Sequence, residues 1–126
     1  SQENYEYAKK YFQDALDIYN KLDNKWGIET SYTNLGNAIA DDGNYEAGLE
    51  YYEKSIRLAE ELDDQYGMAV NYNNIGDSYI KMNQYQKAQE IFFKTLKIAN
   101  DINEKDLIAN DPTNDPDNLS KDLVVE

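Results

Sequence analysis

The sequence predicts an all-α protein built as a solenoid of antiparallel helix pairs. Three observations lead to this fold class. Related phrases recur every 40 residues, apolar residues recur at helical spacing, and short polar turns separate the apolar segments. A fixed period of this length is typical of repeat architectures. The sequence also lacks the period-two alternation that would indicate β-strands.

The repeat is clearest at its tyrosines and glycines. Tyr5, Tyr45 and Tyr85 lie 40 residues apart, and each of them follows an Asn or a Gln. The same interval separates further identical pairs: Gly27/Gly67, Tyr32/Tyr72, Asn34/Asn74, Gly36/Gly76, Glu50/Glu90, Lys54/Lys94 and Ala59/Ala99. Because chance would supply only isolated pairs, a register kept over this much of the chain indicates a true repeat.

Five helices follow from the apolar spacing within the repeat. The first is predicted over 4–22, where apolar side chains step by three or four positions: Tyr5, Ala8, Phe12, Ala15 and Tyr19. The next pair is predicted over 27–41 and 45–62, separated by the turn Asp41-Asp42-Gly43-Asn44. The last pair, over 66–82 and 85–102, repeats this arrangement. Connections this short make neighbouring helices antiparallel.

The two full units resemble the tetratricopeptide repeat, whose signature is W-x2-L-G-x2-Y, then A-x3-F, then P. The first reads Tyr32-x2-Leu35-Gly36-x2-Ile39, then Gly48-x3-Tyr52, and the second reads Tyr72-x2-Ile75-Gly76-x2-Tyr79, then Ala88-x3-Phe92. The period of 40 residues marks a longer variant, since the common period is about 34 residues. The resemblance implies a right-handed superhelical array that binds peptides or partner domains.

The motif also predicts how the helices pack. Its small residues, Gly36, Gly76 and Ala88, should be almost wholly buried where two helices approach closely. The large rings of Tyr52 and Phe92 should fill the space beside them, because protein interiors are close-packed.

The ends of the chain depart from the repeat. We expect the array to occupy residues 1–104, with an acidic linker or tail over 105–126. The first helix matches the second helix of a repeat, so its own partner is missing. Either the chain is a fragment of a larger signalling or regulatory protein, or this helix associates with another copy. Pro112 and Pro116 interrupt a fourth unit. Leu119 and Leu123 then fit either a short capping turn or a frayed tail.

Composition excludes several classes of function. The formal net charge is −13, which disfavours binding to nucleic acids and to anionic membranes. The chain has no Cys and no His, so it lacks the usual metal ligands and the usual general base. We therefore expect no catalytic residues, no metal and no cofactor, and we expect a cytoplasmic binding protein and not an enzyme.

The resemblance implies that the first helix of each pair lines a concave groove. On the faces away from the predicted core, these helices carry mainly amide and charged side chains: Thr33, Asn34, Asn37, Asp41, Asn73, Asn74, Asp77 and Lys81. Asn side chains can bind the backbone of an extended peptide, because they both donate and accept hydrogen bonds. The acidic charge favours a neutral or basic protein ligand over an acidic one. The alternative function is a self-assembly module that stacks repeats between chains.

Overall fold

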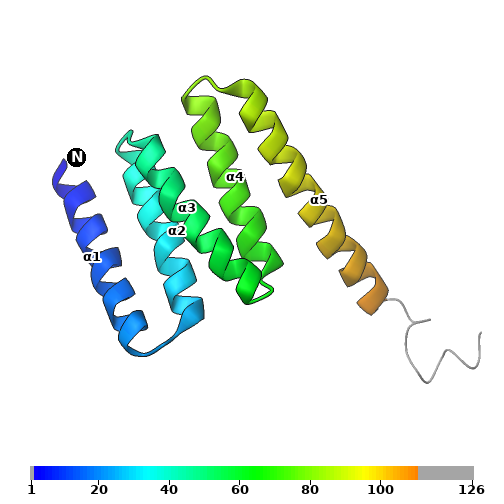
Figure 1. The fold of residues 1–126 in the computed structure, drawn as a ribbon, viewed down its shortest axis with the longest axis horizontal. Helices are drawn as coiled ribbons and strands as arrows, with labels where there is room; N and C mark the ends of the chain where they lie inside the picture. The colour runs from blue at the N-terminus through cyan, green and yellow to red at the C-terminus, as the bar shows by residue number, and fades with distance from the viewer. Residues whose placement is uncertain (1, 111–126) are drawn as a thin grey trace, which may run out of the picture.

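The computed structural model describes residues 2–110 of the chain and the side chains of residues 2–106. It contains α1 (Gln2–Lys21), α2 (Lys25–Asp41), α3 (Tyr45–Glu61), α4 (Gln65–Lys81) and α5 (Tyr85–Asn110). Figure 1 shows these helices side by side in chain order, with α1 and α5 at the two ends. Since residues 2–110 contain no strand, the prediction of an all-α array of helix pairs is confirmed.

The four turns between the helices are built in the same way. Each contains one residue with a positive φ angle, and these residues lie 20 positions apart: Asp23, Gly43, Asp63 and Asn83. Gly, Asp and Asn are the residues that adopt this left-handed conformation most readily. The next amide then donates to a carbonyl of the last helical turn, as Asn24 N does to Tyr19 O at 2.9 Å. This closure ends the helix and returns the chain antiparallel to it.

The residue after each of the first three turns caps the next helix. The side chain of Asn24 accepts a hydrogen bond from Gly27 N at 3.1 Å. Asn44 accepts in the same way at the start of α3, and Asp64 does so at the start of α4. Each cap satisfies an N–H group that has no partner within the helix. The caps therefore fix where α2, α3 and α4 begin.

The core lies between the middle helices. Each helix packs on the one that follows it, and α2 also contacts α4 directly. Tyr52, Ile56 and Ile75 form the buried centre. Four half-buried side chains surround it: Leu49, Tyr72, Tyr79 and Ile91. The core thus joins α3 to α4 and links the two full repeats into one body.

Gly36, Gly76 and Ala88 are buried, as the motif predicted. A Cβ atom on Gly36 would lie 2.7 Å from the ring of Tyr52 and 3.2 Å from the backbone oxygen of Gly48. The equivalent atom on Gly76 would lie 2.5 Å from the ring of Phe92. The same contact of glycine with an aromatic ring therefore holds both helix pairs together.

Replacing Gly36 with Ala should lower the free energy of unfolding by about 1–3 kcal/mol, because the added methyl group overpacks the contact with Tyr52. Helix propensity alone would make the Ala variant more stable by about 1 kcal/mol. A loss of stability would therefore identify overpacking as the cause. Urea unfolding of the single variant and of Gly36→Ala/Tyr52→Ala measures it. The loss should shrink when the ring is absent. A more stable Gly36→Ala chain would contradict the close approach.

The fifth helix is longer than predicted. It was expected to end at residue 102, but α5 continues to Asn110, so the predicted boundary at 104 falls inside a helix. Two side chains in the extra turns contact the start of α4. Tyr66 Oη donates to Asp106 at 3.3 Å, and Lys105 Nζ donates to Gln65 at 3.3 Å. The predicted linker around Pro112 and the capping turn lie outside the described residues.

Candidate functional site

A cavity of about 540 Å³ opens between α2 and α4. The C-terminal halves of these helices form its walls, and two tyrosines of α3 complete its lining. The lining residues are Asn37, Ala40, Asp41, Tyr45, Tyr52, Asn74, Asp77, Ser78, Ile80 and Lys81. Its size is within the range of sites that hold a small ligand or a few side chains of a peptide.

The structure brings together five of the eight residues predicted for the groove. Those that line the cavity are Asn37, Asp41, Asn74, Asp77 and Lys81. Asn34, Thr33 and Asn73 do not line it. Asn34 is half-buried, and Asn73 is exposed.

The ring of Tyr52 forms the inner surface of the cavity and is only 2% exposed. Its hydroxyl group donates a hydrogen bond to Asn37 Oδ1 at 2.7 Å. Burial, together with the nearby charges of Asp41 and Asp77, raises the pKa of Tyr52 to about 12. The hydroxyl therefore stays protonated at neutral pH and keeps its hydrogen bond to the Asn37 oxygen.

The charges at the cavity are unequal. Asp41 and Asp77 are exposed carboxylates on α2 and α4, and Lys81 is the single cationic side chain in the lining. Both carboxylates act on the same buried hydroxyl group of Tyr52, so they converge on this cavity from the two helices. The arrangement presents a net negative charge beside the amide of Asn74 and the ring of Tyr45.

Sequence reasoning missed the apolar and aromatic part of the lining. Tyr45 was noted only as a marker of the repeat, yet it lies half-buried at the cavity. Ile80 and Ala40 also contribute apolar surface. The sequence did contain a signal for two of these residues. Ala40 and Tyr45 flank the turn that joins α2 to α3, so they lie close to the predicted groove residue Asp41.

Thr33 belongs instead to a polar network where α2, α3 and α4 meet. Its hydroxyl donates to Asn71 Oδ1 at 3.0 Å and lies 2.8 Å from Ser55 Oγ. Asn71 Nδ2 donates to Ser55 Oγ at 2.9 Å and to Gly67 O at 2.8 Å. Ser55 Oγ also bonds to Glu29 O at 3.0 Å. Thr33 therefore joins α2 to α3 and α4 and does not line the cavity.

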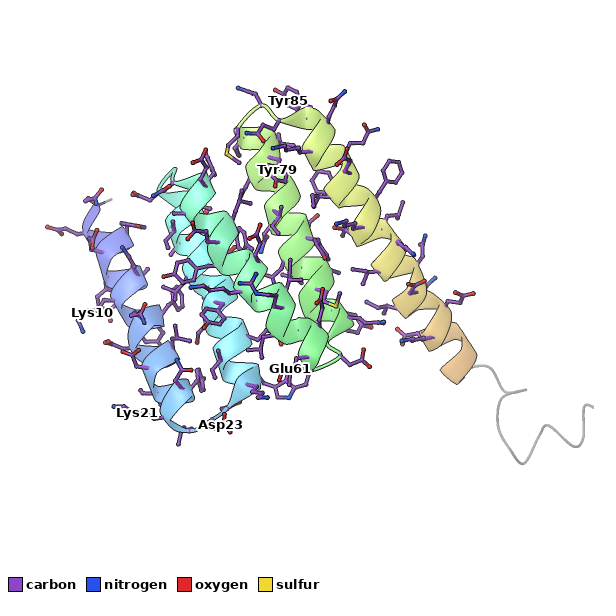
Figure 2. All side chains as sticks on the ribbon, viewed as in Figure 1. Lys10, Lys21, Asp23, Glu61, Tyr79 and Tyr85 are labelled. Carbon is purple, nitrogen blue, oxygen red and sulfur yellow. The ribbon has the colours of Figure 1, made fainter. Side chains whose placement is uncertain are left out.

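Exposed apolar side chains lie at both ends of the array. On α1 they include Tyr7, Tyr11 and Ile18, which share one helical face by their spacing, and the exposed Leu22 follows directly after the helix. Beside α5 a second hollow of about 370 Å³ is lined almost entirely by apolar residues, among them Tyr85, Phe93 and Leu96. Figure 2 shows Tyr85 at the turn that leads into α5, and Lys10 on the outer side of α1.

The fold and the cavity define a class: a helical-repeat array with an open polar groove between the first helices of two pairs. A family model described as tetratricopeptide repeat matches residues 27–101, which is more than half of the chain. The chain belongs to this family. Proteins with these repeats generally mediate protein–protein interaction or scaffolding, and the repeats are typically not catalytic. No curated protein matches the chain as a relative.

Within the described residues, no helix combines the length and the apolar character needed to cross a membrane.

Proposed function

We propose that the chain binds an extended peptide or a partner domain through the cavity between α2 and α4. The observation that carries this proposal is the convergence of Asp41, Asp77 and Asn74 on one open cavity. The amide of Asn74 can bond to the ligand backbone. The two carboxylates favour a Lys or Arg side chain, because opposite charges attract across an interface. A neutral or basic ligand is therefore preferred over an acidic one.

The lining also explains how such a ligand would be held. Tyr45, Ala40 and Ile80 supply apolar surface around the polar groups, a mixture that is usual for sites that bind side chains. Tyr52 is already bonded to Asn37, so the inner surface is preorganised before a ligand arrives. Preorganisation reduces the entropy that binding would otherwise cost.

Selection from a random displayed-peptide library tests the preference for basic ligands. We expect the selected sequences to be enriched in Lys and Arg. The Asp41→Asn/Asp77→Asn variant should then bind a selected peptide about three- to tenfold more weakly, since an exposed ion pair contributes about 0.2–1 kcal/mol. Fluorescence titration at low and high salt measures this loss, which should decrease at high salt. Enrichment of acidic peptides would contradict the proposal.

Two matched controls locate the binding site. The Asp17→Asn/Asp101→Asn variant makes the same change in charge at exposed positions outside the cavity, and it should bind like the wild type. Asn34 and Asn74 occupy equivalent positions 40 residues apart, but only Asn74 lines the cavity. Asn74→Ala should therefore weaken binding more than Asn34→Ala does. The reverse order would place the ligand elsewhere.

Self-assembly is the second candidate function. It is favoured by the apolar faces at opposite ends of the array, the Tyr11 face of α1 and the Leu96 hollow beside α5. An end-to-end contact between copies would cover both faces and would generate an open chain of molecules, since the two surfaces differ. Light scattering at several protein concentrations separates the two candidates. Growth of the mass with concentration supports assembly, whereas a constant monomer mass supports ligand binding.

A further inference from the structure

A buried glutamate lies beside a second carboxylate where α2 approaches the start of α4. Glu29 is only 4% exposed, and its Oε2 atom is buried with no hydrogen-bond partner. Its Oε1 atom and Asp64 Oδ2 both lie against Gly67, so closely that a Cβ atom on Gly67 would collide with each of them. The 40-residue register places Ala69 at the equivalent position of the next repeat. An acid thus stands at a helix contact where the next repeat has a small apolar residue.

In the part of the chain that the structure describes, no ion pair joins a cation to Glu29. Lys25, one turn earlier on α2, is bonded to Glu61 of α3 at 2.8 Å, and Figure 2 shows Glu61 at the end of α3. The other group of α3 beside Glu29 is the hydroxyl of Ser55, which donates a hydrogen bond to the backbone oxygen of Glu29. On the α1 side, the ring of Tyr19 packs against Gly27. The α4 side presents Asp64, preceded by Asp63. On the α5 side, Lys105 lines a hollow together with Asp64, but its ammonium group donates to Gln65. Among residues 2–106, the two acidic side chains therefore meet without an ion-pair partner.

The roles of the two acids differ. Asp64 caps α4, where its Oδ1 atom accepts a hydrogen bond from Gly67 N at 3.0 Å. The start of a helix favours a negative charge, so Asp64 is the better site for the ionised form. Glu29 is then the better site for a proton, and its protonated carboxyl group can donate a hydrogen bond to Asp64. Burial, then the hydrogen bond to Asp64 and then its charge raise the pKa of Glu29 to about 8.

We propose that Glu29 and Asp64 share one proton and form a pH-sensitive contact between α2 and α4. With the proton in place, a hydrogen bond joins the two helices. When the proton leaves, two carboxylates face each other in a buried contact, and the start of α4 moves away from α2. The contact lies beside the network of Thr33 and Asn71, at the end of the helices opposite the ligand cavity. The proton would thus regulate the spacing of the two helices that form the cavity walls.

Stability measurements test the shared proton. The folded chain holds a proton that the unfolded chain releases at the ordinary pKa of a glutamate, so stability should fall as pH rises between about 4.5 and 8. Urea unfolding from pH 5 to pH 9 should show this fall in the wild type and not in Glu29→Gln, whose amide can still donate to Asp64. The control Glu50→Gln, a change on the exposed face of α3, should show the same fall in stability as the wild type. Identical profiles for wild type and Glu29→Gln would overturn the proposal.

Carbon NMR of the carboxyl groups gives a second measurement that needs no unfolding. The Glu29 signal should titrate well above the ordinary range of a glutamate. In Asp64→Asn the midpoint should fall toward that range, because Asn can cap α4 as Asn24 caps α2 but carries no charge. A wild-type midpoint near pH 4–5, the ordinary range of a glutamate, would overturn the shared proton.

A distance measurement tests the movement. The chain has no native cysteine, so spin labels can be placed at Thr30→Cys and Val70→Cys, which are exposed equivalent positions on α2 and α4. Between pH 6 and pH 9 the distance between the labels should lengthen or broaden, and it should stay constant in the Glu29→Gln background. An unchanged distance in the chain that retains Glu29 would overturn the regulatory part of the proposal. None of these measurements depends on a ligand.

Discussion

Replacing Tyr52 with Ala is expected to lower the free energy of unfolding by about 3–5 kcal/mol, the usual cost of removing a large buried aromatic side chain. Tyr52 is 2% exposed and sits in the core with Ile56 and Ile75. Its ring also fills the space beside Gly36. The substitution therefore opens a cavity that touches α2, α3 and α4 at once. Urea unfolding followed by circular dichroism measures the loss.

Two comparison variants separate packing from hydrogen bonding. Tyr52→Phe removes only the hydroxyl bond to Asn37 and should cost about 1 kcal/mol. Tyr7→Ala removes a tyrosine that is 74% exposed and should change stability by no more than about 0.5 kcal/mol. If Tyr52→Phe were as damaging as Tyr52→Ala, the bond to Asn37, and not the ring, would hold the helices together.

Replacing Asn71 with Ala is expected to cost about 3 kcal/mol. The Asn71 side chain is 1% exposed and bonds to Thr33, Ser55 and Gly67 O. Its removal leaves several buried polar groups short of a partner, at about 1–3 kcal/mol for each group that remains unsatisfied. Thermal or urea unfolding of the variant measures the loss.

The neighbour Asn73 provides the control for this prediction. It lies on the same helix, but it is exposed. Asn73→Ala should be neutral or slightly stabilising, since Ala is the better helix former. Equal losses for the two variants would mean that the network contributes nothing beyond helix propensity.

The periodic features of the fold could be read from the sequence. Turns, caps and close contacts all depend on local residue types that recur at fixed intervals, such as the Asp, Gly or Asn of each turn and the pairing of Gly36 with Tyr52. The 40-residue register also applies to contacts between a lysine and a tyrosine ring. Lys54 lies 5.8 Å from the ring centre of Tyr32, and Lys94 lies 5.6 Å from that of Tyr72, one repeat later.

The features that the sequence did not reveal depend on contacts between different helices. Thr33 was placed in the groove because it lies on the polar face of α2, but Ser55 and Asn71 draw it into a buried network. Helical periodicity describes one helix at a time and cannot show such partners. The contacts of the longer α5 are likewise not local, since Tyr66 of α4 and Asp106 of α5 meet across 40 residues of chain.

The packing of each helix on its chain neighbours has a consequence for folding. In the described part of the chain, α1 packs only on α2 and α5 packs only on α4, whereas each middle helix has at least two partners. Contacts between sequence neighbours close small loops, so folding should be fast. In such linear arrays, stability is a sum over adjoining units, and the terminal units open first. The candidate cavity draws all its residues from α2, α3 and α4, so it should persist through the opening of either end.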